Sequence, residues 1–151
     1  MKVLIVYDSV YGNTEKITQA MAEAIATSGE AKLLRAGEAN PPELESIELL
    51  IVGSPTHGGR PTPAVQDFLN VVAEQSLKGI KVAAFDTRAT SKFAKIFGNA
   101  AGRIARHLTK KGGVLVGSPQ GFLVTGTKGP LKEGELERAA AWTKGILESK
   151  K

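Results

Sequence analysis

Polar side chains gather around a single glycine near the start of the chain, in the segment Asp8–Thr14 (DSVYGNT). An apolar run, Lys2–Asp8, leads into it, and Asn13–Ser28 follows with apolar residues at helical spacing. A loop that ends where a helix begins offers backbone N–H groups and the positive end of the helix dipole, and both favour an anion. The segment therefore indicates an anion site, with a turn that merely caps the helix as the alternative.

The side chains of this segment exclude two common nucleotide-binding loops. Ser9, Tyr11, Asn13 and Thr14 supply hydroxyl or amide groups, and Gly12 permits a tight turn. No lysine follows the glycine, as it does in loops that bind nucleoside triphosphates, and the spaced glycines of dinucleotide-binding turns are missing. Four polar side chains around one glycine also exceed what a helix cap requires.

A second loop, Gly53–Pro61, follows the apolar run Leu49–Ser54 and is rich in proline and glycine. Such a composition predicts a loop of defined shape rather than a floppy one. Its central residues are Pro55, Thr56, His57, Gly58 and Gly59. His57 is interpreted either as a site residue or as a turn histidine that bonds its own backbone.

A third loop, Phe85–Phe93, follows the apolar run Ile80–Phe85. Asp86, Thr87 and Arg88 come directly after this run, so their polar groups are expected near its carboxyl end. Phe93 is interpreted either as a site residue or as the first core residue of the next helix.

Apolar runs and helical patterns alternate along the chain, which predicts an α/β fold with a five-stranded parallel sheet and helices on both faces. In such doubly wound sheets, ligands bind beyond the carboxyl ends of the strands where the strand order reverses. The expected strands are Lys2–Asp8, Lys32–Arg35, Leu49–Ser54, Ile80–Phe85 and Val114–Gly117, the last interrupted and resumed at Phe122–Val124. A short helical turn is expected within Arg35–Glu48, and the final helix is expected to start near Glu133.

The segment Ser9–Thr14 (SVYGNT) resembles the flavodoxin phosphate loop, [ST]-x-[TY]-G-x-T. The resemblance covers essentially residues 1–151, and it implies one flavodoxin-like domain with the strand order 2-1-3-4-5. It also implies that this loop holds the 5′-phosphate of FMN without any basic side chain. The residues that the resemblance assigns to the phosphate are Ser9, Val10, Tyr11, Gly12, Asn13 and Thr14.

The same resemblance assigns the other two loops to the flavin. Pro55, Thr56, His57, Gly58 and Gly59 would lie along the isoalloxazine, with the Gly58–Gly59 peptide as the candidate partner of flavin N5, since glycine tolerates both sides of a peptide flip. Asp86 and Thr87 would contact the ring or the ribityl chain, and Arg88 would lie over the pyrimidine edge. Phe93, five residues before Gly98, matches the position of a tyrosine that stacks on the flavin in many members.

Two departures from the family pattern concern charge and aromatic residues. Flavodoxins are usually acidic, whereas this chain has 20 Lys and Arg against 15 Asp and Glu. The excess indicates either an ordinary solvated surface with a modest positive charge or a surface that selects an acidic redox partner. Positive charge at Arg60, Arg88, Lys92 and Lys95 also predicts a less negative potential for the reduced flavin couple than in acidic members. The usual pair of stacking aromatic residues is missing, and this weakens the apolar burial around the flavin ring.

Composition limits the other classes of function. The chain contains no cysteine, which excludes disulfides, thiol nucleophiles and thiolate metal sites. Aromatic residues make up 5%, which argues against stacking on nucleic acid. The run Val3–Tyr7 is too short for a signal peptide or a membrane span, so a cytoplasmic protein that starts at or near Met1 is expected. His107 is interpreted as an exposed helix residue, and Trp142 as a packing residue of the last helix.

The function expected from this resemblance is a single-domain electron carrier that shuttles electrons through bound FMN, with a monomer favoured. One alternative is an FMN-dependent NAD(P)H:quinone-type reductase, because such enzymes share a Pro-Thr-x-x-Gly loop that is similar to Pro55–Gly59. Another alternative is a flavin-free binding module that has kept the fold, which the missing aromatic pair suggests.

Overall fold

A computed structural model of the chain describes residues 1–39, 46–89, 99–126 and 128–148. Its centre is a parallel sheet in the order β2-β1-β3-β4-β5, with β6 also paired to β4. The strands are β1 (Lys2–Tyr7), β2 (Glu30–Arg35), β3 (Leu49–Pro55), β4 (Lys81–Ala89), β5 (Val114–Leu115) and β6 (Gln120–Val124). The predicted parallel sheet and its strand order are confirmed.

The fifth position of the sheet is shared by β5 and β6. Lys81 at the start of β4 pairs with Val114, whereas Phe85 farther along β4 pairs with Gln120. The chain therefore leaves the sheet after β5 and returns to the same edge, as the interrupted apolar pattern predicts. Because β6 continues along β4 to Ala89, it reaches the carboxyl end of the sheet.

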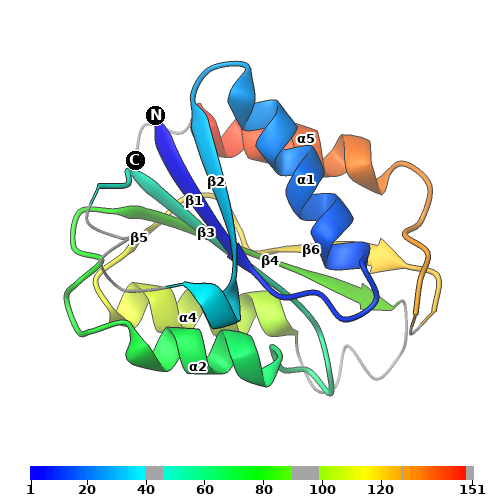
Figure 1. The fold of residues 1–151 in the computed structure, drawn as a ribbon, viewed down its shortest axis with the longest axis horizontal. Helices are drawn as coiled ribbons and strands as arrows, with labels where there is room; N and C mark the ends of the chain where they lie inside the picture. Colours follow the sequence, from blue (N-terminus) through cyan, green and yellow to red (C-terminus); the bar gives the residue numbers. More distant parts are fainter. Residues whose placement is uncertain (40–45, 90–98, 127, 149–151) are drawn as a thin grey trace.

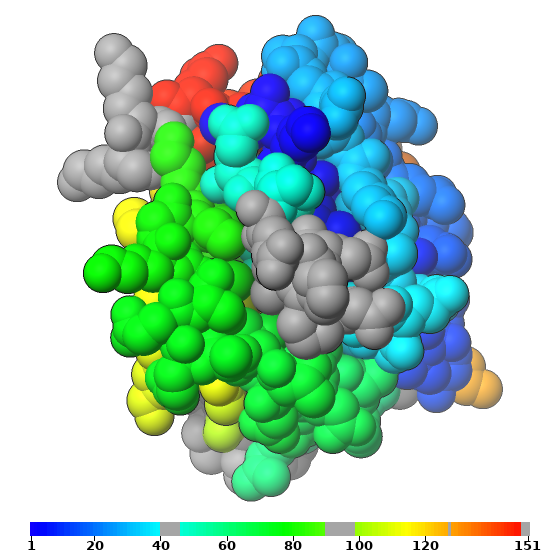
Figure 2. All heavy atoms as spheres, turned by 60° about the vertical axis from the view of Figure 1, so that its left-hand side comes forward, coloured from blue at the N-terminus to red at the C-terminus, as the bar shows by residue number. Residues whose placement is uncertain are grey.

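Helices of the described residues cover both faces of the sheet (Figure 1). The helices α1 (Asn13–Ala26) and α5 (Glu135–Leu147) pack together on one face, and α2 (Pro63–Val71) and α4 (Ala100–Lys110) lie on the other. A 3-10 turn, η1 (Ala36–Glu38), follows β2 and contacts α2. Figure 2 shows the green surface of α2 next to the cyan surface of η1. Within the described residues, no helix is long and apolar enough to cross a membrane.

The sheet separates two apolar cores, because β1, β3 and β4 carry apolar side chains on both faces. In the core under α1 and α5, the ring of Phe85 lies edge-on to those of Phe122 and Trp142, at centroid distances of 6.0 and 6.3 Å. A Cβ atom on Gly53 would overlap the Phe85 ring, so glycine at this position of β3 makes room for the aromatic cluster. The prediction that Trp142 is a packing residue is confirmed.

The register of the sheet brings the carboxyl ends of three strands to one edge. Tyr7 at the end of β1 pairs with Gly53 of β3, and Pro55 of β3 pairs with Thr87 of β4. The carboxyl ends of β1, β3 and β4 therefore lie together, at the edge where the strand order reverses between β1 and β3.

Candidate functional site

A small cavity lies at this edge, at the carboxyl ends of β1, β3, β4 and β6. It encloses about 110 Å³. Its lining consists of Ser9, Val10, Tyr11, Asn13, Thr14, Pro55, Thr56, His57, Thr87, Arg88, Ala89 and Val124. None of these lining residues is acidic, so the cavity suits an anion or a ligand with an anionic group.

The first loop is shaped by Gly12 and Ser9. Gly12 is the N-cap residue of α1, has a φ of 90°, and has no side chain that could cap the helix. The Ser9 hydroxyl oxygen instead accepts hydrogen bonds from the backbone N–H of Gly12 at 3.1 Å and of Glu15 at 3.3 Å. The N-terminus of α1 thus keeps N–H groups available beside the cavity, where the helix dipole favours negative charge.

Two side chains at the start of α1 tie this loop to other parts of the site. The hydroxyl groups of Thr14 and Thr87 share a buried hydrogen bond of 2.8 Å, which joins α1 to β4. The Asn13 amide donates to the carbonyl oxygen of Lys128 at 3.1 Å, and a Cβ atom on Gly129 would lie only 2.5 Å from that amide nitrogen. The chain after β6 therefore closes over the start of α1.

Arg35, at the end of β2, supports the first loop from behind. Its guanidinium donates to the carbonyl oxygen of Ser9 at 3.2 Å and lies 3.7 Å from the Asp8 carboxylate and 3.6 Å from that of Glu15. It also lies over the ring of Tyr7, at 5.4 Å from the centroid. The pKa of the Tyr7 hydroxyl is raised, first by burial and then by the negative charge of Glu15. The sequence gives no sign of this role, because Arg35 reaches the loop only through the pairing of β1 with β2.

The second loop is closed by a short bridge and held by α4. The backbones of His57 and Arg60 bond to each other in both directions, at 2.9 and 3.1 Å. Between them, Gly58 and Gly59 have φ values of 59° and 79°, a region in which side chains other than glycine are strained. The Gly59 carbonyl oxygen accepts a hydrogen bond of 2.9 Å from Nε of Arg103.

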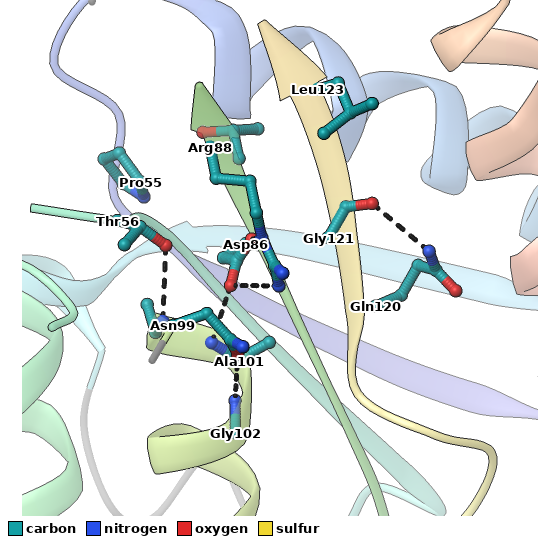
Figure 3. Close-up of polar contacts among 12 residues, drawn as sticks. Pro55, Thr56, Asp86, Arg88, Asn99, Ala101, Gly102, Gln120, Gly121 and Leu123 are labelled. Carbon is teal, nitrogen blue, oxygen red and sulfur yellow. Dashed lines mark hydrogen bonds and ion pairs between the residues drawn. The ribbon is translucent and has the colours of Figure 1, made fainter. Parts of the chain in front are cut away.

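Thr56 and Asp86 fix the start of α4 against the sheet (Figure 3). The Thr56 hydroxyl accepts from the backbone N–H of Ala100 at 3.2 Å, and the Asp86 carboxylate accepts from that of Ala101 at 2.9 Å. Asn99 caps the same helix by accepting from the backbone N–H of Gly102. The loop after β3 and strand β4 are therefore both anchored to the first turn of α4. Asp86, Thr87 and Arg88, which the sequence placed in a loop after the strand, lie within β4, because their backbone pairs with β3 and β6.

The Asp86 carboxylate is fully buried and forms a two-point ion pair with Arg88, at 2.7 and 2.8 Å (Figure 3). A Cβ atom on Gly121 of β6 would overlap the Arg88 guanidinium, so glycine there makes room for the pair. Much of the positive charge that the sequence places at Arg88 is thus balanced by Asp86. Arg88 lines the cavity. Asp86 does not line it and influences it only through the ion pair with Arg88.

Most of the predicted site residues come together in the structure. Gly12, Gly58, Gly59 and Asp86 adjoin the cavity without being among its lining residues, and Phe93, Lys92 and Lys95 lie outside the described residues. The lining residues that sequence reasoning missed are Ala89 and Val124, which the pairing of β4 with β6 brings to the cavity. The predicted residues that line the cavity are Ser9, Val10, Tyr11, Asn13, Thr14, Pro55, Thr56, His57, Thr87 and Arg88.

Comparison with protein families gives a match over most of the chain. The family described as flavodoxin domain matches residues 4–113. A curated flavodoxin from Clostridium saccharobutylicum is 29% identical over 147 residues, which is 92% of this chain and 91% of that protein. An NAD(P)H dehydrogenase (quinone) from Gluconacetobacter diazotrophicus is 30% identical over 114 residues. The matched segment is 59% of this chain and spans only 57% of the length of that dehydrogenase.

Among solved structures, a flavodoxin from the domain Archaea has the same fold. Its TM-score is 0.82, and the superposition covers 98% of this chain and 97% of that one. The sequence identity is 22%, so this likeness concerns the fold alone.

Proposed function

Because this chain belongs to the flavodoxin domain family, we propose that it binds FMN at the cavity described above and carries electrons between redox partners. The observation that carries the proposal is the start of α1, where the left-handed Gly12 has no side chain to cap the helix and the Ser9 hydroxyl accepts only from the backbone N–H of Gly12 and of Glu15. Hydroxyl and amide donors surround this N-terminus, and no carboxylate lines the cavity. This donor set fits a phosphate group.

The residues of the chain have separate tasks in this proposal. Ser9–Thr14 would hold the phosphate, and the Thr14–Thr87 hydrogen bond would keep this loop at a fixed distance from β4. Tyr11 and His57 are the ring-bearing side chains of the cavity lining, and both are exposed enough to rest against a flat ligand. The flavin itself would supply the redox chemistry, while the protein supplies orientation and electrostatics.

The size of the cavity bears on how a flavin would sit. Its volume of about 110 Å³ is below the roughly 300–1,000 Å³ of sites that enclose a whole ligand. A bound flavin would therefore keep part of its ring at the surface. An exposed ring edge suits transfer of electrons to a partner protein and needs no general acid from the chain.

The experiment that tests the proposal is an absorption spectrum of freshly purified protein, followed by titration with FMN. We expect flavin bands, or saturable uptake of FMN at one equivalent per chain. Replacing Gly12 by Val should weaken uptake strongly, because a φ of 90° is strained for a branched residue. Gly37→Val is a matched control, since a Cβ atom there meets open space and Gly37 lies outside the cavity. A colourless protein that ignores added FMN contradicts the proposal and favours a flavin-free module.

A reductase is the second candidate, and the similarity to an NAD(P)H dehydrogenase (quinone) is the observation that favours it. The shared feature within the site is the loop that begins with Pro55 and Thr56. Steady oxidation of NADPH by the flavin-loaded protein in the presence of a quinone would support this candidate. Reduction of the flavin only through a partner protein would support the electron carrier.

A further inference from the structure

A second hollow, larger than the site cavity, lies between α2 and α4 on the opposite face of the sheet from α1 and α5. It has a volume of about 520 Å³. Pro61 and Leu69 form its apolar floor, and polar and charged side chains form its walls. The side chains of the walls are Arg60, Gln66, Arg103, Arg106, His107, Thr109 and Lys110. We call this hollow the basic groove.

The cations of the basic groove form a stripe. Arg103, Arg106 and Lys110 have i, i+3 and i+7 spacing, so they share one face of α4. At 1.5 Å per residue, the stripe is about 10 Å long. Arg60 adds a fourth cation from the loop before α2. No carboxylate lines the groove, and in the part of the chain that the structure describes none of these four cations forms an ion pair.

The ionisation of His107 reflects this concentration of charge. The pKa of His107 is lowered below its ordinary value, first by desolvation of the ring and then by the positive charges of Lys110, Lys111 and Arg106. A surface that disfavours one more positive charge favours a negatively charged partner by the same electrostatics.

The basic groove also adjoins the candidate FMN site. Arg60 lines the groove, and its backbone is bonded to that of His57, which lines the site cavity. Arg103 lines the groove as well and holds the Gly59 carbonyl oxygen of the same loop. A molecule seated in the groove would therefore lie next to the loop that runs along the proposed flavin.

We propose that the basic groove docks an acidic segment of the redox partner, with carboxylates of that segment paired to Arg106, Lys110 and Arg60. This inference rests on the proposed function, since it supplies the surface at which the partner would be held. Arg60, Arg106 and Lys110 are exposed, and the last two are a turn apart on α4. Such a spread arrangement matches a chain with repeated carboxylates better than one compact anion. Arginine side chains bind carboxylates at two points, which favours such a partner further.

The test uses the full chain loaded with FMN and a fluorescein-labelled oligoglutamate peptide as the probe. Fluorescence anisotropy gives the dissociation constant at low and at moderate salt. We expect saturable binding that weakens as salt rises. The double variant Arg106→Gln with Lys110→Gln should weaken binding by about tenfold or more, because it removes two of the four cations.

A matched control distinguishes the effect of the basic groove on peptide binding from the effect of the net charge of the protein. Lys16→Gln with Lys144→Gln also removes two exposed helix lysines, from α1 and α5 on the other face of the sheet. We expect this control to change the dissociation constant by less than about twofold, since these sites are screened from the groove. Equal weakening in both double variants would overturn the proposal. Inorganic phosphate that displaces the peptide better than sodium chloride at equal ionic strength would overturn it too, because the groove would then be a small-anion site.

Measuring the FMN bound by each variant distinguishes a failure of the docking proposal from a failure of the proposed function. Arg106 and Lys110 do not line the site cavity, so both double variants are expected to take up FMN like the parent protein. A parent protein that takes up no FMN would contradict the proposed function, and the peptide titration would then be made on the chain without FMN. Normal FMN uptake without any peptide binding would contradict the docking proposal alone.

Discussion

Arg103, one turn into α4, donates from Nε to the carbonyl oxygen of Gly59 across 2.9 Å. The two residues are 44 positions apart in the sequence, and their contact joins the second loop to the basic groove. Gly59 belongs to the loop beside the proposed flavin, and the remainder of the Arg103 side chain lines the basic groove. The loop with two left-handed glycines is thus held by a side chain, not by its own backbone alone.

Replacement of Arg103 by Gln is therefore expected to loosen the second loop. A hydrogen bond from a charged donor is worth about 1.5–3 kcal/mol, and Arg103 is half-buried, so we expect the free energy of unfolding to fall by about 1 kcal/mol and FMN to bind about tenfold more weakly. Urea denaturation and an FMN titration measure the two effects. Arg106→Gln is the matched control, because it lies on the same helix without a contact to Gly59. Equal FMN affinity in the two variants would contradict the role of Arg103.

Replacement of Thr14 by Val tests the hydrogen bond that joins α1 to β4. Thr14 and Thr87 are both buried, and valine would leave the Thr87 hydroxyl without its partner. An unpaired buried hydroxyl costs about 1–3 kcal/mol, so we expect a loss of stability in that range and weaker binding of FMN. Thr14→Ser keeps the hydroxyl and should retain most of both properties. A valine variant with the stability and FMN affinity of the parent protein would show that the Thr14–Thr87 hydrogen bond contributes to neither property.

The sequence allows much of the fold to be predicted because the strands of a doubly wound sheet are buried on both faces. Leu49–Ser54 and Ile80–Phe85 read as continuous apolar runs for this reason. Leu49–Ser54 lies within β3, whereas β4 starts one residue after Ile80 and continues past Phe85 to Ala89. The weaker pattern of β2 reflects its edge position, where its side chains are only partly buried. Its start at Glu30, two residues before the predicted one, follows from pairing with Lys2 and not from hydrophobicity.

The site is predictable where its signal is local and unpredictable where it depends on pairing between distant segments. Ser9–Thr14 is a continuous loop with a recognisable pattern, so its residues were found together. Strand pairing and helix packing bring Arg35, Arg103 and Val124 to the site or to the loops around it. These residues are far from the loops in the sequence, so no short sequence motif includes them. The ion pair of Asp86 with Arg88 depends on both residues being in strand β4, because alternate side chains of a strand lie on the same face.

Replacement of Asp86 by Asn tests that ion pair. Asparagine can still accept the hydrogen bond from the Ala101 N–H, so the start of α4 should stay in place. The Arg88 guanidinium, whose side chain is 25% exposed, would lose its counter-charge. Breaking a buried pair from one side costs about 3–5 kcal/mol, and partial exposure of Arg88 reduces this, so we expect a loss of about 2–3 kcal/mol by urea denaturation.

Two further variants check the cause of that loss. Asp67→Asn removes an exposed carboxylate from α2 and should change stability by less than about 0.5 kcal/mol. Gly121→Ala keeps Asp86 but places a Cβ atom where the Arg88 guanidinium lies, so it should also destabilise the protein. A stable Gly121→Ala variant would contradict the tight fit of Arg88 against β6.

The stability of the protein at acidic pH should depend on Glu135, the first residue of α5. Its carboxylate accepts two hydrogen bonds from Arg138, at 2.9 and 2.6 Å, and one from the backbone N–H of Leu123 in β6, at 2.6 Å. The bonds from Arg138 are the largest cause that lowers the pKa of Glu135 below its ordinary value of 4.5. The charged form is thus more favourable in the folded chain than in the unfolded one, and its contribution is fully present above that value.

Glu135→Gln should therefore be less stable than the parent protein at neutral pH, and the difference should shrink as the pH falls from about 4.5 through the lowered pKa of the folded state. Urea denaturation at a series of pH values measures the difference. Glu137→Gln, an exposed neighbour on the same helix, is the control and should follow the parent protein throughout. A difference between Glu135→Gln and the parent protein that stays constant across this pH range would mean that the carboxylate adds no charge-dependent stability, and that its contacts to Arg138 and Leu123 act only through packing.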